Sequence, residues 1–146
     1  MWCGIDVGAK GALAIIDEEG AKVYDFPGDI SSLGNLFINE MIGKKIKGCV
    51  IEKVSAMPKQ GVVSMFKFGC NFGSYLGILS VLQIPHILVT PQSWQKKMLD
   101  AGTGNTKERS LNMARRLFPD IDLSKKKHDG RADALHLARY AIEYFN

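Results

Sequence analysis

The stretch Trp2-Cys3-Gly4-Ile5-Asp6-Val7-Gly8 decides how the rest of the chain is interpreted. It is a short apolar run that carries one carboxylate near its end and then reaches a glycine, a pattern typical of a buried β-strand followed by a turn. An ionised aspartate in a buried strand is costly unless a cation holds it, so Asp6 is a candidate metal ligand. The alternative is a solvated aspartate at a strand end, and acidic partners further along the chain would argue against it.

Length and composition are those of one globular domain. The 146 residues are 46% hydrophobic and 23% charged, so we expect residues 1–146 to form a single domain with a packed core. The N-terminus lacks the basic-then-apolar organisation of a signal peptide, and no apolar run approaches the roughly 20 residues of a membrane span, so we expect a cytoplasmic protein with no membrane partner. Cys3, Cys49 and Cys70 lie in apolar runs without CxxC spacing, which predicts buried reduced thiols.

Charge is divided unevenly along the chain. Residues 1–90 carry eight Lys/Arg and eight Asp/Glu, whereas residues 91–146 carry eleven and seven. The whole formal charge of +4 therefore lies in the last third, which favours a polyanionic partner there. A solvated basic helix surface would give the same counts.

Hydrophobic periodicity predicts an α/β fold with a mixed five-stranded sheet. Strands at 11–17 and 21–26 around a turn would form an antiparallel meander with the first strand. A helix over about 33–41 then leads to a strand at 48–52, which this connection should make parallel to the first. The remaining pattern predicts a long helix at 62–82, a strand at 84–90, and helices at 92–99, at 105–118 and from 129 onward.

Three more acids are expected beside Asp6. Glu52 ends the strand predicted to lie parallel to the first, so both acids should meet at one edge of the sheet. Asp129 and Asp133 are four residues apart and share one face of the terminal helix, with His136 on the same face. Asp129 could instead be an N-cap, whereas Asp133 lies among small apolar residues that should contact the sheet.

Clustered carboxylates with little nitrogen and no sulfur favour Mg²⁺ or Mn²⁺ over zinc. Two such ions about 3.5–4 Å apart can clamp a phosphodiester, one activating water and the other stabilising the leaving oxygen. The basic last third would then bind the remaining phosphates. The acids therefore predict metal-dependent hydrolysis of nucleic acid.

Glycine recurs at every fourth position of the long helix, at Gly69, Gly73 and Gly77. Each costs about 1 kcal/mol relative to alanine inside a helix, so we expect this stripe to lie tightly against the sheet or a second subunit. Phe68, Phe72 and Tyr75 occupy another face, where core or dimer packing is favoured over base stacking.

Three motifs together resemble the RuvC family of Holliday junction resolvases, within the RNase H-like nucleases. They are Gly4-Ile5-Asp6-Val7-Gly8, Val50-Ile51-Glu52 with Val54, and the run from Asp129 to Leu135, DGRADAL. The loop 56–61 with residues 65–69, and Val89-Thr90-Pro91 with Trp94, are similar to the bacteriophage and prophage branch. The resemblance covers almost the whole chain in the right order.

The resemblance implies a bacterial, phage- or prophage-encoded homodimer that cuts a four-way DNA junction by symmetric paired nicks. It implies 5′-phosphate and 3′-hydroxyl products, two Mg²⁺ or Mn²⁺ ions per active site and no small-molecule cofactor. The catalytic and metal-binding residues would be Asp6, Glu52, Asp129 and Asp133, with His128 and His136 as possible auxiliaries. Basic, polar and apolar side chains expected to contact DNA are Lys53, Met57, Lys59, Gln60, Phe66, Lys96, Lys97, Lys107, Lys125, Lys126, Lys127 and Arg131.

The sequence departs from the family pattern at two places. Family members commonly carry the last acidic pair three residues apart, whereas Asp129 and Asp133 are separated by four. Many cellular members place an aromatic wedge three residues after the second acid, where this chain has Ser55. Either junction opening would fall to Met57 or Phe66, or the sequence preference of cleavage would be relaxed.

Alternative functions share part of this site. An RNase H-like nuclease acting on flaps, other branched DNA or RNA–DNA hybrids would use the same four acids. A junction-binding protein without cleavage would not need them. An actin-like ATPase also begins with an Asp-x-Gly turn, but 146 residues are too few for its two lobes.

Overall fold

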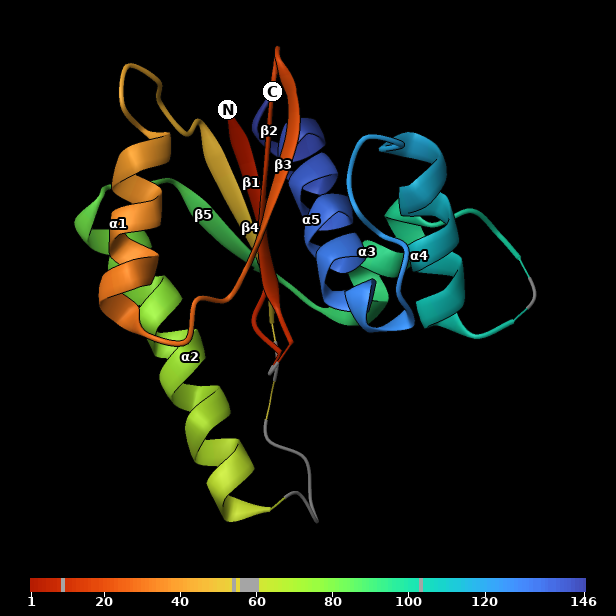
Figure 1. Cartoon of the computed structure of the whole chain (residues 1–146), viewed down its shortest axis with the longest axis horizontal. Helices are drawn as coiled ribbons and strands as arrows, with labels where there is room; N and C mark the ends of the chain where they lie inside the picture. Colours follow the sequence, from red (N-terminus) through yellow and green to blue (C-terminus); the bar gives the residue numbers. More distant parts are fainter. Residues whose placement is uncertain (9, 54, 56–60, 103) are drawn as a thin grey trace.

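The fold is a five-stranded sheet with helices on both faces (Figure 1). The computed structural model describes residues 1–146 except 9, 54, 56–60 and 103. The elements follow the order β1 (Trp2–Asp6), β2 (Ala12–Asp17), β3 (Gly20–Asp25), α1 (Ile30–Glu40), β4 (Gly48–Glu52), α2 (Val62–Val81), β5 (His86–Val89), α3 (Pro91–Met98), α4 (Thr106–Leu117), the 3₁₀-helix η1 (Lys126–His128) and α5 (Asp129–Phe145). The predicted α/β class is confirmed, and η1 replaces part of the expected basic loop.

Strand β1 is the centre of the sheet, whose order is β3-β2-β1-β4-β5. It runs antiparallel to β2 and parallel to β4, with Ile5 opposite Ile51. Strand β5 continues the parallel part beside β4. The predicted meander and the predicted parallel pairing of the first and fourth strands are both confirmed.

Helix α5 lies directly on β1 because Gly4 meets the helix where Ala134 and Ala138 stand. A Cβ atom at Gly4 would lie 2.1 Å from the backbone nitrogen of Ala138 and 2.3 Å from the carbonyl oxygen of Ala134. Glycine at this position is therefore a condition for the close approach of helix and strand. That approach carries the acidic first turns of α5 to the end of β1.

The opposite face of the sheet packs against α1 and α2. Leu33 and Phe37 from α1 and Tyr75 and Leu79 from α2 are buried among strand residues such as Ile5. Each fully buried large apolar side chain contributes about 1.5–3 kcal/mol to stability. Phe68 and Phe72 are partly buried against this core, so the expected packing of these aromatic residues is confirmed for the monomer.

The N-terminal half of α2 projects beyond the sheet (Figure 1). Val62 and Phe66 are 84% and 73% exposed. In the described part of the chain, no atom outside the helix comes within 4 Å of a Cβ built at Gly69, Gly73 or Gly77. The expectation that the glycine stripe lies on the sheet is therefore wrong, because that face of α2 points away from it.

Two further expectations about this helix are also wrong. Cys70 was expected to be buried but is exposed, whereas Cys3 and Cys49 are buried as predicted. No apolar run was expected to approach the length of a membrane span, yet α2 is long and apolar enough to cross a membrane by length and composition alone, with a mean hydropathy of 1.2 over 18 residues, of which 11% are buried. One such helix is weak evidence for a membrane span. Tyr75 and Leu79 nevertheless anchor its second half in the core.

Candidate active site

The candidate site lies where β1 and β4 end and α5 begins. Asp6 and Glu52 are the last residues of two neighbouring parallel strands. Helix α5 reaches the same place, since a Cβ at Gly130 would lie 2.9 Å from a carboxylate oxygen of Asp6. Asp129 and Asp133 flank this contact on the first turns of α5.

Asp6 and Asp133 each lie within electrostatic range of the other three acids. Burial is the main cause that raises the pKa of Asp6 to about 6, and the charges of Glu52 and Asp129 also raise it. The hydrogen bond from the Gly8 backbone N–H acts in the opposite direction. Burial likewise raises the pKa of Asp133 to about 7, and the charges of the other three acids add to the effect. Burial also raises the pKa of Glu52. The fold therefore concentrates negative charge where ionisation is unfavourable.

The described residues contain no group of three or more His, Cys, Asp or Glu side chains close enough together to hold a metal ion. Instead, each carboxylate has its own donor. The hydrogen bonds are Gly8 N to Asp6 at 3.0 Å, Trp94 Nε1 to Glu52 at 2.8 Å, Lys107 Nζ to Asp129 at 3.0 Å and Ser110 Oγ to Asp133 at 2.5 Å. The acids are thus neighbours rather than a closed ligand set.

The chemistry of the donors nevertheless fits a hard divalent cation. The four side chains offer only carboxylate oxygens, the ligands that Mg²⁺ and Mn²⁺ prefer. Three of the acids have a raised pKa, which a nearby cation would reverse. A cation would therefore offset the cost of ionising these acids, which comes from burial and, for Asp6 and Asp133, also from neighbouring negative charges.

Asp129 is the first residue of α5, and His128 stands at the N-cap without a side-chain capping bond. The alternative that Asp129 is the N-cap is therefore wrong. An acid in the first helical turn is favoured by the helix dipole. Lys107 from α4 pairs with this acid, and its side chain is 73% exposed while that of Asp129 is 23% exposed. The ion pair therefore lies at the open side of the site.

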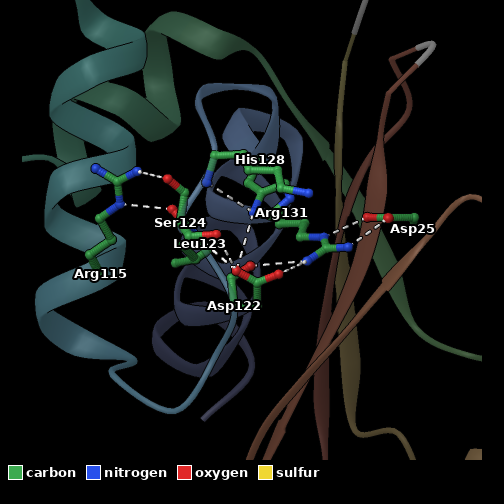
Figure 2. A network of polar contacts seen from close by, with 8 residues as sticks. Asp25, Arg115, Asp122, Leu123, Ser124, His128 and Arg131 are labelled. Atoms are coloured by element: carbon green, nitrogen blue, oxygen red, sulfur yellow. Dashed lines mark hydrogen bonds and ion pairs between the residues drawn. The ribbon is translucent and has the colours of Figure 1, made fainter.

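The two candidate auxiliary histidines have partners outside the four acids. His136 is buried, with Nε2 3.0 Å from the Ser110 carbonyl oxygen and Nδ1 3.2 Å from Arg139. Burial lowers the pKa of His136 to about 4, so its ring is neutral. His128 is buried as well, with Nδ1 3.5 Å from the backbone nitrogen of Lys125 and 3.8 Å from Asp122 (Figure 2).

Arg131 holds α5 against the sheet, as Figure 2 shows. Its Nε and Nη2 atoms each donate to a different carboxylate oxygen of Asp25, at 2.7 Å, and Nη1 donates to the Asp122 carbonyl oxygen at 3.0 Å. Arg115 donates to the carbonyl oxygens of Leu123 and Ser124 in the same loop. These bonds give Arg131 a bracing role inside the protein. Its expected contact with DNA stays a prediction.

The other candidate DNA contacts fall into three groups. Lys97 pairs with Glu143 at 3.1 Å and lies over the Tyr140 ring. Met57, Lys59 and Gln60 lie outside the described residues. The rest are exposed, as Lys97 is: Lys53, Phe66, Lys96, Lys107, Lys125, Lys126 and Lys127.

A groove of about 1010 Å³ opens next to the acids, between the end of β4 and helix α2. Lys53 follows Glu52 directly and lines this groove, together with Phe26, Phe66 and Lys67. Gln92 from α3 lines it as well. The groove combines the positive charge of two lysines with the exposed ring of Phe66, and such features bind phosphates and bases.

Sequence reasoning missed two site residues, Trp94 and Ser110. Trp94 packs in the core with 0% exposure, and its indole N–H donates to Glu52. Ser110 carried no signal at all, since a serine within an amphipathic helix is ordinary. Only the packing of α3 and α4 against α5 reveals their contacts.

Comparison with known proteins finds likeness in structure but not in sequence. No family model and no curated protein sequence matches the chain. Thermus thermophilus RuvC in complex with a Holliday junction substrate is similar with a TM-score of 0.65 and 17% identity, over 93% of this chain and 88% of that one. A second T. thermophilus RuvC structure has a TM-score of 0.61 and 17% identity, over 93% and 89%.

Identity this low shows the fold and no more. It leaves the resemblance to phage and prophage members a prediction. The chain therefore has the RNase H-like α/β fold of RuvC.

Proposed function

We propose that this chain, acting as one nuclease domain, resolves four-way DNA junctions by metal-dependent phosphodiester hydrolysis. The observation that carries the proposal is the convergence of four acids, three with a raised pKa, at the ends of β1 and β4 and the start of α5. The likeness in fold to a RuvC that was solved with a Holliday junction supports the choice of substrate. The proposal includes a cytoplasmic location in a bacterial cell, in keeping with a DNA substrate and with the likeness in fold to a bacterial RuvC.

Asp6, Glu52, Asp129 and Asp133 would hold two Mg²⁺ or Mn²⁺ ions. Held by these acids, such ions would activate a water and stabilise the leaving 3′ oxygen, which would give a 5′-phosphate and a 3′-hydroxyl. The fold fixes the positions of two of these ligands, because Asp6 and Glu52 lie at the ends of neighbouring strands. Lys107 stands beside Asp129 with an exposed ammonium group that can bind the neighbouring phosphate.

The groove beside Glu52 would take the DNA near the branch point. Lys53 and Lys67 supply positive charge, and Phe66 offers an aromatic face that is 73% exposed. Base stacking on an aromatic side chain contributes about 1–3 kcal/mol per base. Phe66 is therefore our candidate for holding the junction open in place of the missing wedge at Ser55.

The proposed enzyme is a homodimer, because symmetric nicks require two active sites. The uncovered face of α2, with its three glycines and the exposed Val62 and Val63, supports an interface there. Gly73→Leu would block the close approach of a second subunit and yield monomers. Gly34→Leu on α1, where a Cβ also meets open space, is the matched control and should remain dimeric. Sedimentation velocity distinguishes the two, and a dimeric Gly73→Leu protein rejects this interface.

One cleavage assay tests the activity. Labelled four-way junction, Y-fork, linear duplex and RNA–DNA hybrid are each incubated with Mg²⁺, Mn²⁺ or EDTA. Wild type is compared with Asp6→Asn and with Asp120→Asn, which changes an exposed acid outside the site. Paired junction nicks that need metal and are lost only in Asp6→Asn support the proposal.

Other outcomes favour the alternatives. Preferential cutting of forks or hybrids would indicate an RNase H-like nuclease with another substrate. Tight junction binding without cleavage under any metal would indicate a binding protein. Equal cutting of linear duplex would reject junction selectivity.

A further inference from the structure

Two of the four acids are held by buried donors from different helices. Trp94 on α3 donates from Nε1 to Oε1 of Glu52 at 2.8 Å, and Ser110 on α4 donates from Oγ to Oδ1 of Asp133 at 2.5 Å. The Trp94 side chain is 0% exposed and Ser110 is 1% exposed. Both hydrogen bonds lie in the protein interior, where water does not compete for the donors.

His136 joins these two contacts into one unit. Its ring stacks on that of Trp94 with centroids 6.1 Å apart and planes 19° apart. A carbonyl oxygen only accepts and a guanidinium only donates, so Nε2 carries the proton toward Ser110 and Nδ1 accepts from Arg139. The neutral ring therefore has one fixed orientation, and it buttresses the indole and the serine backbone together.

The contact between Trp94 and Glu52 is more than the packing of an aromatic residue. The chain has two tryptophans, and the other one, Trp2, buries an Nε1 atom that has no hydrogen-bond partner among the described residues. The fold therefore tolerates a buried, unpartnered indole N–H, whereas at Trp94 that group is aimed at a carboxylate of the site.

We propose that Trp94 and Ser110 are positioning residues of the candidate metal site, each fixing one oxygen of an acid and leaving the other oxygen for a cation. The inference rests on the proposed function. Partners of this kind set the orientation of ligands, and losing one typically weakens metal affinity or activity by about 10- to 100-fold.

The test measures the affinity for Mn²⁺ alone, from the electron paramagnetic resonance signal of the free ion, on protein stripped with EDTA. Trp94→Phe removes the donor and keeps an aromatic ring, while Trp2→Phe removes an indole N–H that touches no acid. We expect the Mn²⁺ dissociation constant to rise about tenfold in Trp94→Phe and to stay within about twofold of wild type in Trp2→Phe. Junction cleavage by Trp94→Phe should recover at saturating Mn²⁺.

Ser110→Ala provides an independent test that does not depend on how the larger ring is replaced. It should weaken Mn²⁺ binding in the same way, and Ser110→Thr, which keeps the hydroxyl, should restore the affinity. Urea unfolding in EDTA checks that each variant still folds cooperatively. A purely structural role predicts lower stability in EDTA with unchanged Mn²⁺ affinity.

The outcomes separate the two proposals. Wild-type affinity in both Trp94→Phe and Ser110→Ala overturns the positioning role and leaves the nuclease proposal standing. Absence of Mn²⁺ binding by wild type overturns the proposed metal site and the positioning role with it.

Discussion

Replacing Asp133 by asparagine should stabilise the metal-free protein at alkaline pH. Burial raises the pKa of Asp133 to about 7 from an ordinary 3.8. A carboxyl group with a raised pKa in the folded state binds a proton more tightly there than in the unfolded chain. The contribution of protonated Asp133 to the free energy of unfolding is therefore fully present below pH 4 and is lost as pH rises through about 7. Asparagine cannot ionise and still offers an oxygen to Ser110.

The size of the effect follows from the same two pKa values. The difference between about 7 and 3.8 corresponds to about 4 kcal/mol when Asp133 is fully ionised. We halve this because the side chain retains some exposure, which gives a gain of about 2 kcal/mol for Asp133→Asn at pH 8.5. At pH 4 the variant should gain nothing.

Urea unfolding in EDTA at pH 4, 6 and 8.5 measures this difference, with Asp120→Asn as the control. The control changes an exposed acid on a loop, so its difference from wild type should not vary with pH in this way. Saturating Mn²⁺ should reverse the order and make wild type the more stable protein. A difference between wild type and Asp133→Asn that stays constant from pH 4 to 8.5 would refute the electrostatic reasoning.

Three further predictions follow from the site and its supports. Mn²⁺ should raise the melting temperature of wild type, and Asp6→Asn should weaken that response because one ligand is lost; calorimetry measures it, and equal responses contradict it. Gly130→Ala should destabilise the protein by more than about 2 kcal/mol, since its Cβ would lie 2.2 Å from the Lys10 carbonyl oxygen; an unchanged urea midpoint contradicts the close approach. Arg131→Ala should lower stability by about 1–3 kcal/mol without changing the salt dependence of junction binding, because its guanidinium is committed to Asp25.

Much of the fold could be predicted from the sequence because the signals are local. Alternating and helical periodicity located the strands and helices, and Pro91 and Asn105 stand at the start of α3 and at the N-cap of α4 in the structure. The parallel pairing of β1 with β4 followed from the helical connection between them. This parallel pairing is enough to predict that Asp6 and Glu52 lie at the same edge of the sheet.

The surroundings of the acids could not be predicted in this way. Trp94 and Glu52 are 42 positions apart, and Arg131 and Asp25 are 106 apart. No periodicity relates such pairs, because their contact depends on how three helices stack on the sheet. The same holds for the glycine stripe of α2, since spacing shows that the residues share a face but not what that face meets.

The sequence by itself determined the order of the elements, the central strand Trp2–Asp6 and the two strand ends that carry Asp6 and Glu52. These features depend on the local preferences of neighbouring residues. Only the tertiary structure decided which donor holds each acid, that Arg131 is a brace, and that half of α2 stands uncovered. Those features depend on distances between segments far apart in the chain, which are fixed only when the close contact of Gly4 with α5 brings the layers together.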